Sequence, residues 1–293
     1  MEVKLNNHQV VLSDGRKLGF DQRGRIDGSP VFYFHGSPSS RLESKLFLQD
    51  ELIDDLKIRL ISIDRPGIGL SDYQTGRSVL DWPHDVLAVA DHLNIDRFAI
   101  LAYSLGGPYG IACGYAIPER LTRIGIVSGA AFYSNPELMA NVNQGTRNYL
   151  NLPREKPWMA KTFLNGMKLV ARFAPKMMVK NANSLLPPSD KRVVSDLQIQ
   201  NSFIISVNEA FRQGIQGSFH ESLLMIQDWG FDLKKFSAPS IIWHGTEDQN
   251  IPLQMAEHLS GLLPLSKIEI LEGEGHLSLF ANNTRNILMR LLE

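Results

Sequence analysis

The stretch FAILAYSLGG, residues 98–107, decides the fold. Its apolar, strand-forming run ends at Ser104, and small residues then open a helix that Pro118 ends. A strand, a tight turn and a helix in this order place the serine at the apex, with its hydroxyl held out of the sheet. Such a turn tolerates only small neighbours, and Ala102 and Gly106 qualify, although the usual pattern has glycine at the first position. A buried strand followed by a serine helix cap would have the same residues, so the function depends on the rest of the chain.

Short apolar runs alternate with helical patterns in both end regions of the chain, which is typical of a mostly parallel sheet covered by helices on both faces. Near the N-terminus, an Asp-Gly pair at residues 14 and 15 separates two strand patterns and predicts an antiparallel ribbon. The expected fold class is therefore α/β. Strands are expected at residues 9–13, 16–24, 31–34, 59–63, 98–103, 124–127, 240–243 and 267–271, and helices at 41–56, 157–173, 189–214 and 220–227 among others.

The alternation stops between residues 132 and 217, where prolines interrupt helical patterns and no strand is apparent. We expect these residues to form an inserted helical cap on a core made of residues 1–131 and 218–293. Five of the nine methionines lie in the insertion, and flexible thioether side chains suit a surface that adapts to apolar ligands. For any single one of them, core packing is the more usual explanation. The methionines expected to bind substrate are Met167, Met177 and Met178.

The charge and cysteine content restrict the partners of the chain. Thirty Lys and Arg residues nearly balance 31 Asp and Glu residues, for a formal charge of −1, so no overall field recruits nucleic acid or an anionic membrane. A small, uncharged molecule is the expected partner. The one cysteine, Cys113, cannot form an internal disulfide. With no leader pattern and no run of 18 apolar residues, we expect a cytoplasmic protein, whose oligomeric state the sequence leaves open.

Two loops near the C-terminus supply the partners that a serine nucleophile needs. A serine hydroxyl reacts only when a base, usually histidine, removes its proton, and a carboxylate orients that base. Asp248 and His276 each follow a predicted strand, and the carboxyl ends of parallel strands meet at one edge of a sheet. The order Ser104, Asp248, His276 is the order of the catalytic residues in α/β hydrolases. Glu247 is the alternative acid.

In these features the chain resembles α/β-hydrolases that carry an inserted cap. The resemblance rests on five motifs in the family's order: His-Gly-Ser-Pro at 35–38, Asp-Arg-Pro-Gly-Ile-Gly-Leu-Ser at 64–71, the turn at Ser104, Gly-Thr-Glu-Asp at 245–248 and Gly-His at 275–276. It implies the α/β-hydrolase fold over nearly the whole chain outside the insertion. It also implies that Ser104, Asp248 and His276 are catalytic, because the acid of this family lies four residues before a proline, here Pro252.

The resemblance further implies the surroundings of the nucleophile. The family's oxyanion donors are the amide after the nucleophile and the amide after His-Gly, which are those of Leu105 and Ser37 here. Gly36 and Tyr103, which precede Ser37 and Ser104, are expected at the substrate. No paired cysteines, metal-ligand spacing, dinucleotide fingerprint or phosphate-binding loop is present, so neither a metal nor a cofactor is expected.

Serine at the turn implies acyl chemistry, because family members that act on haloalkanes or epoxides have aspartate there. We expect a carboxylesterase that cleaves uncharged esters of short or medium chain through an acyl-enzyme. A peptidase or a hydrolase of carbon–carbon bonds remains an alternative, although proline iminopeptidases usually have Gly-Gly-Ser-Trp-Gly at the turn. An alternative of another class is a ligand receptor that keeps the three catalytic residues but turns over slowly.

Overall fold

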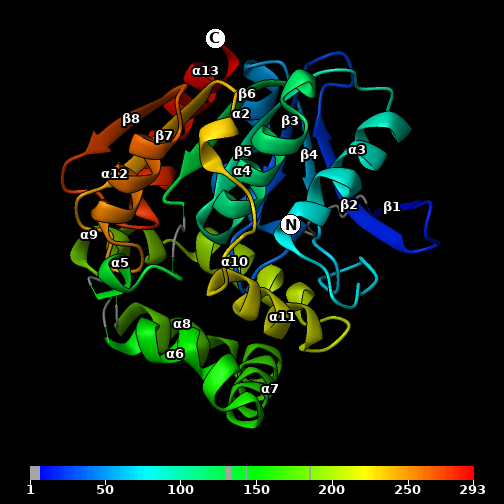
Figure 1. Ribbon diagram of the computed structural model, residues 1–293. Helices are drawn as coiled ribbons and strands as arrows, with labels where there is room; N and C mark the ends of the chain where they lie inside the picture. The colour runs from blue at the N-terminus through cyan, green and yellow to red at the C-terminus, as the bar shows by residue number, and fades with distance from the viewer. Residues whose placement is uncertain (1–6, 130–132, 141, 143, 185) are drawn as a thin grey trace.

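The apolar run before Ser104 forms strand β5 (Phe98–Tyr103), which lies between β3 and β6 in an eight-stranded sheet (Figure 1). The computed structural model describes residues 7–129, 133–140, 142, 144–184 and 186–293. The strand order is β1-β2-β4-β3-β5-β6-β7-β8. The β1–β2 and β2–β4 pairs are antiparallel, and every other pair is parallel. The predicted α/β class and the antiparallel N-terminal ribbon are confirmed.

Every predicted strand forms, with ends that shift by at most a few residues. The remaining strands are β1 (His8–Val11), β2 (Lys17–Gly24), β3 (Ser29–Phe34), β4 (Ile58–Ile63), β6 (Leu121–Val127), β7 (Ser240–Gly245) and β8 (Ser266–Leu271). The α-helices are α1 (Ser44–Phe47), α2 (Asp50–Asp55), α3 (Trp82–His92), α4 (Gly107–Ala116), α5 (Pro136–Ala140), α6 (Gln144–Glu155), α7 (Pro157–Phe173), α8 (Pro175–Ser184), α9 (Pro188–Val194), α10 (Leu197–Ala210), α11 (Gln216–Met225), α12 (Leu253–Leu262) and α13 (Ser278–Leu292). Short 3₁₀ helices are η1 (Arg41–Glu43), η2 (Val79–Asp81), η3 (Ser104–Gly106), η4 (Pro118–Arg120) and η5 (Leu233–Lys235).

Both faces of β5 are buried, which explains why its sequence is apolar throughout. One face, with Ile100 and Ala102, packs in a cluster to which α3, α4 and α12 contribute. The other face, with Leu101 and Tyr103, packs in a second cluster with α1, α2 and α13. The sheet is therefore covered by helices on both sides, as predicted.

Two of the predicted helices are wrong in their continuity. The helix expected over residues 41–56 is divided into η1, α1 and α2, because Leu48 adopts an extended conformation between the two α-helices. The helix expected over 189–214 is divided at Asp196, whose carboxylate accepts the backbone N–H of Gln198 and caps α10. In both places the apolar pattern of the sequence stays helical although the backbone does not. An extended residue interrupts the first helix, and a side-chain cap starts a new helix in the second.

Between β6 and β7, the described residues form helices and turns and no strand. The expected start of the cap at residue 132 lies outside the described residues. Its expected end at residue 217 lies within α11, which packs closely on the core. A Cβ added to Gly217 would lie 2.4 Å from the carbonyl oxygen of Gly67, so this helix contacts the loop after β4 backbone to backbone.

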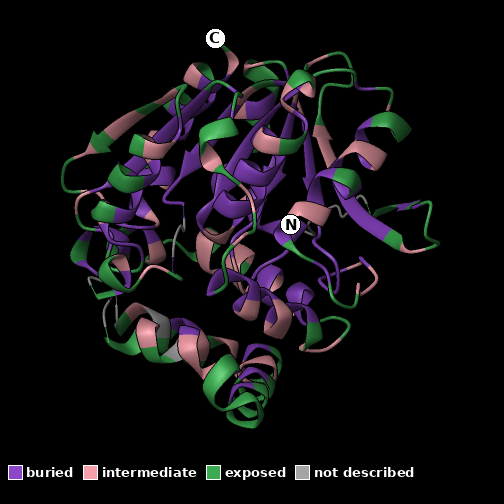
Figure 2. Cartoon of the chain, in the orientation of Figure 1, coloured by how far each residue is buried: buried purple, intermediate pink, exposed green. Residues whose placement is uncertain are grey.

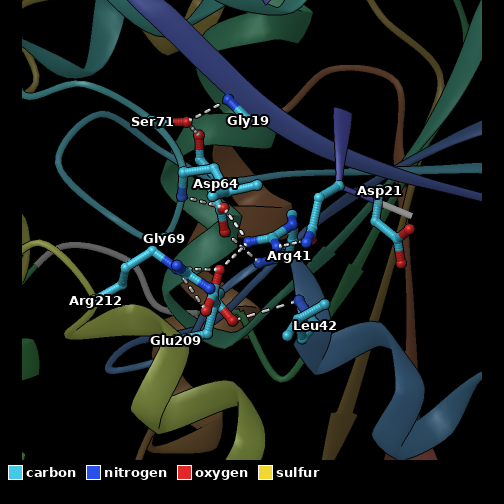
Figure 3. Close-up of polar contacts among 12 residues, drawn as sticks. Gly19, Asp21, Arg41, Leu42, Asp64, Gly69, Ser71, Glu209 and Arg212 are labelled. Atoms are coloured by element: carbon cyan, nitrogen blue, oxygen red, sulfur yellow. Dashed lines mark hydrogen bonds and ion pairs between the residues drawn. The ribbon is translucent and has the colours of Figure 1, made fainter. Parts of the chain in front are cut away.

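A buried ion-pair cluster joins α10 to the loops that follow β3 and β4 (Figure 3). Nη1 of Arg41 lies 2.6 Å from Oδ2 of Asp64 and 2.6 Å from Oε1 of Glu209, and all three residues are buried. Asp64 also accepts the backbone N–H of Leu70, at 2.9 Å, and Arg212 contacts Glu209 at 2.9 Å. The loop after β4 therefore closes around one carboxylate.

A second buried ion pair joins α11 to the same loop. The guanidinium of Arg65 pairs with the carboxylate of Glu221 and donates to the carbonyl oxygens of His35 and Gly36. The positive charge of Arg65 helps to lower the pKa of Glu221 to about 2, against burial, which raises it. The loops after β3 and β4 are thus fixed to each other and to α11.

Replacing the central arginine of the first cluster should destabilise the protein strongly. Arg41→Met leaves the buried carboxylates of Asp64 and Glu209 without their shared counter-ion, and we expect a loss of about 3–5 kcal/mol in the free energy of unfolding. Arg285→Met removes an exposed pair with Asp55 and should cost less than about 1 kcal/mol. Urea denaturation followed by circular dichroism measures both, and equal losses in the two variants would contradict the assignment.

Candidate active site

Ser104 lies at the predicted tight turn between β5 and α4, with a φ of +52° in the left-handed region. The small neighbours are required by close packing. A Cβ added to Gly106 would lie 2.3 Å from the carbonyl oxygen of Phe34, at the end of β3. The methyl group of Ala102 faces Gly110 of α4, where an added Cβ would lie 3.1 Å from it. A glycine in the facing helix thus accommodates the alanine that departs from the usual pattern.

The structure brings the three predicted catalytic residues together in one chain of hydrogen bonds. Nε2 of His276 lies 3.0 Å from Oγ of Ser104, and Nδ1 lies 2.8 Å from Oδ2 of Asp248. The other carboxylate oxygen of Asp248 accepts the backbone N–H groups of Asn250 and Ile251, each at 2.9 Å. The carboxylate is therefore held from one side while it contacts the imidazole on the other.

The alternative acid has a different environment. Glu247 is exposed, and its carboxylate accepts a hydrogen bond from Oγ of Ser189 in α9, at 2.8 Å. Asp248 rather than Glu247 therefore contacts the imidazole of His276.

Burial and the neighbouring charge act in opposite directions on His276 and Asp248. Burial lowers the pKa of the His276 imidazole, but the Asp248 carboxylate outweighs it and raises that pKa above 6.5. Burial likewise raises the pKa of Asp248, and His276 lowers it below its ordinary value of 3.8. The pair therefore favours a charged carboxylate beside an imidazole that accepts a proton readily.

An acidic residue that the sequence analysis missed holds the histidine loop. Asp190, fully buried in α9, accepts the backbone N–H groups of His276, Leu277 and Ser278 at 3.0, 3.0 and 2.9 Å. A Cβ added to Gly275 would lie 2.5 Å from Oδ1 of Asp190, which explains the glycine before the histidine. In the sequence, Asp190 shows only as an acidic residue at a helix start, because its partners lie more than 80 positions away.

A second missed carboxylate holds the loop after β3. One oxygen of Glu43 accepts the backbone N–H of Gly36 at 2.7 Å and the hydroxyl of Tyr33 at 2.8 Å. Burial raises the pKa of Glu43. Its carboxyl group lies in the wall of a cavity next to Ser104. Glu43 thereby fixes the segment that leads into Ser37.

The cavity has a volume of about 340 Å³ and opens beside Ser104 and His276. Most of its wall is apolar, from α1, α6, α8, α9 and α10 and from the loops of the core. The predicted residues Gly36, Ser37, Tyr103 and Leu105 all line it. The hydroxyl of Tyr103 also donates to the carbonyl oxygen of His276, at 3.2 Å. Further lining residues are Leu46, Tyr133, Leu150, Val179, Leu186, Val194, Ile199, Phe203 and Ile251.

The three methionines expected at the substrate do not line this cavity. Met167 and Met178 pack against a small apolar cluster between α7 and α10, and Met177 is 47% exposed. Val179, the neighbour of Met178, lines the cavity from α8 instead. The expectation depended on how α7 and α8 are rotated, which methionine content does not determine, and a role of these three residues at the substrate stays a prediction.

The amides of Ser37 and Leu105 stay the predicted oxyanion donors. Ser37 follows Gly36 in the segment that Glu43 holds, and Leu105 is the second residue of η3. The first amides of a helix have no acceptor within it, so they suit a developing negative charge.

Comparison with known proteins identifies relatives of this chain. The model of the alpha/beta hydrolase fold family matches residues 29–282. A "Probable proline iminopeptidase" of Leptolyngbya boryana is 22% identical over 281 residues, which cover 88% of this chain and 84% of that protein. The "Uncharacterized hydrolase YcgS" of Bacillus subtilis (strain 168) is 29% identical over 120 residues. That match covers 41% of this chain and 40%, less than half, of the relative.

Solved structures share the whole architecture. The esterase RhEst1 from Rhodococcus sp. ECU1013 has a TM-score of 0.70 and 19% identity, over 98% of this chain and 97% of the other. A thermophilic esterase from Thermogutta terrifontis has a TM-score of 0.67 and 20% identity, over 97% and 96%. At these identities the likeness establishes the fold. With the family model matched from β3 into α13, the chain belongs to the alpha/beta hydrolase fold family.

Proposed function

We propose that the protein is a serine hydrolase that cleaves uncharged carboxylic esters of short or medium acyl chain. The observation that carries the proposal is the unbroken set of hydrogen bonds from Ser104 through His276 to Asp248, at the edge of a mostly apolar cavity. This arrangement supplies a nucleophile, a base and an orienting acid. The cavity supplies a place for an acyl chain.

Each residue has a role in two steps. Oγ of Ser104 attacks the ester carbonyl while Nε2 of His276 takes its proton, and the same proton then passes to the leaving alcohol. Asp248 keeps the other proton on Nδ1 and stabilises the imidazolium. The amides of Ser37 and Leu105 donate to the carbonyl oxygen as it becomes negative. Water, activated by His276, then attacks the acyl-enzyme and releases the acid.

Hydrolysis of a peptide at the same residues is the second candidate, favoured by the carboxyl group of Glu43 in the cavity wall and by the iminopeptidase relative. A charged carboxylate there would attract a substrate ammonium group. Glu43, however, already accepts hydrogen bonds from Gly36 and Tyr33, and burial raises its pKa, which disfavours its charged form. These contacts favour the uncharged ester.

Labelling of the nucleophile tests the proposal directly. A fluorophosphonate should form one adduct, on Ser104, located by peptide mass mapping. Ser104→Ala should lose the label and reduce hydrolysis of an aryl ester by about 10⁴-fold or more. Ser195→Ala, at an exposed serine of the insertion, serves as the matched control and should keep both. An adduct on another residue contradicts the assignment, and stabilisation by ligands without any turnover would favour a receptor.

The rate of hydrolysis should rise with pH as His276 loses its proton, with a midpoint above 6.5 because Asp248 raises the imidazole pKa. Asp248→Asn removes that charge, so the midpoint should fall, and kcat should fall by about 10⁴-fold as the tautomer is lost. Glu247→Gln is the matched control and should leave the midpoint in place. A pH–rate profile of each variant measures this, and the opposite ranking would transfer the role to Glu247.

Catalytic efficiency should rise with acyl length and then fall. Each methylene buried in the cavity contributes about 0.8 kcal/mol until the chain outgrows it. Val179→Phe narrows the cavity and should move the optimum to a shorter acyl group. Met177→Phe, at an exposed position of the same helix, is the control and should leave the optimum in place. Hydrolysis of p-nitrophenyl esters from acetate to octanoate measures the profile. A falling profile together with faster cleavage of amino-acid anilides would favour the peptidase.

A further inference from the structure

The charge of the chain is unevenly distributed. Residues 156–189 contain six Lys and Arg residues and no Asp or Glu, so this segment has a formal charge of +6. The other 259 residues together have a charge of −7. The near-neutral total therefore hides a strongly basic region that comprises α7, α8 and the start of α9.

The same region gathers exposed apolar side chains. Of the twelve large hydrophobic residues that are exposed among the described parts of the chain, six lie between residues 158 and 177. Single exposed hydrophobic residues are normal on a protein surface, but a cluster of them indicates an interaction site. These six are Trp158, Met159, Phe163, Leu169, Phe173 and Met177.

Helix α7 has two apolar faces with different environments. Its inner face is buried through Leu164 and Ala171, which pack against α10. Its outer face presents Trp158, Leu169 and Phe173, which are 69%, 55% and 74% exposed. In Figure 1 this helix lies at the end of the molecule opposite the C-terminus, and Figure 2 shows exposed residues along it.

Basic side chains accompany the outer face of α7. The guanidinium of Arg172 lies 5.7 Å from the ring centroid of Phe173, beside the exposed aromatic group. Lys156 precedes the helix, and Lys176 and Lys180 follow it on α8, all three exposed. Aromatic groups with adjacent lysines and arginines are typical of helices that lie in the interface of a membrane.

We propose that the outer face of α7, together with the basic residues at its ends and on α8, docks on the surface of an anionic lipid bilayer. Charge favours this occupant over a second copy of the chain, because two copies of a segment with a formal charge of +6 would repel each other. No helix among the described residues is long and apolar enough to cross a bilayer, so α7 lies on the surface rather than through it. The proposal replaces the expectation, drawn from the total charge, that no membrane takes part.

Docking would bring the cavity close to lipid-dissolved substrates. Helix α8, which carries Lys176 and Lys180, also contributes Val179 to the cavity wall. An amphiphilic ester held in the bilayer would then be the substrate class. This last step rests on the proposed esterase function, whereas the docking itself does not.

Vesicle flotation tests the docking without any turnover. The full chain should float with vesicles of 70% phosphatidylcholine and 30% phosphatidylglycerol, and not with phosphatidylcholine alone. The triple variant K156Q/K176Q/K180Q should bind at least about tenfold more weakly. A matched triple variant of exposed lysines elsewhere, K234Q/K235Q/K267Q, changes the total charge equally and should bind as the wild type does.

The apolar contribution needs its own variant. W158S/F173S should lose flotation even at low salt, and the control I26S/L265S, at exposed apolar residues outside the insertion, should keep it. Lipids brominated in the acyl chain should quench the fluorescence of the wild type, and Trp158→Phe should remove that quenching while flotation persists.

Three results would overturn the proposal. The first is equal flotation of K156Q/K176Q/K180Q and its control. The second is a dimer of the wild type, found by sedimentation equilibrium, that W158S/F173S dissociates. The third is that a single-stranded oligonucleotide releases the protein from the vesicles and that its own binding is weakened by K156Q/K176Q/K180Q. Loss of ester hydrolysis alone, with flotation intact, would contradict only the proposed function.

Discussion

Three buried carboxylates, one each from α9, α10 and α11, hold loops that surround Ser104 and His276. Asp190 of α9 holds the backbone of the His276 loop, Glu209 of α10 pairs with Arg41 after β3, and Glu221 of α11 pairs with Arg65 after β4. A buried charge without a partner is costly, so each of these contacts strongly disfavours separation of α9, α10 and α11 from the sheet. The helices α9 and α10 therefore help to position the loops around Ser104 and His276, and they also line the cavity.

Three histidines at or near the carboxyl ends of strands, His35, His244 and His276, differ in pKa because their surroundings differ. His35 is buried, and burial together with the charge of Arg65 lowers its pKa to about 3. His244 lies 3.7 Å from Asp248, yet burial dominates and lowers its pKa. His276 alone of these three has a raised pKa, because it forms the close hydrogen bond to the same carboxylate. The first two remain neutral and contact neighbouring loops, and the third is the one able to exchange a proton near neutral pH.

The features that could be predicted are those that short stretches of the sequence indicate. The strand before Ser104 is apolar on both faces, and the motifs around Asp248 and His276 follow strands, so the fold and the meeting of these residues follow from short stretches. The role of Asp190 could not be predicted, because its partners are distant in sequence and its own position resembles any helix start. Which side chains of α7 and α8 line the cavity could not be predicted either, because the rotation of each helix about its axis is set by packing against distant residues. The basic region of residues 156–189 was missed because its positive charge is cancelled by the negative charge of the rest of the chain in the total.

The contact between Ala102 and Gly110 has a consequence for how this sequence can vary. With alanine on the strand, any side chain at Gly110 would crowd its methyl group, and with glycine on the strand, an alanine in the helix would meet no such obstacle there. The two positions therefore share room for one methyl group between them. A lineage that exchanged the positions of glycine and alanine would pass more easily through the glycine–glycine pair, with a small void, than through the alanine–alanine pair, whose methyl groups would lie 3.1 Å apart close to Ser104.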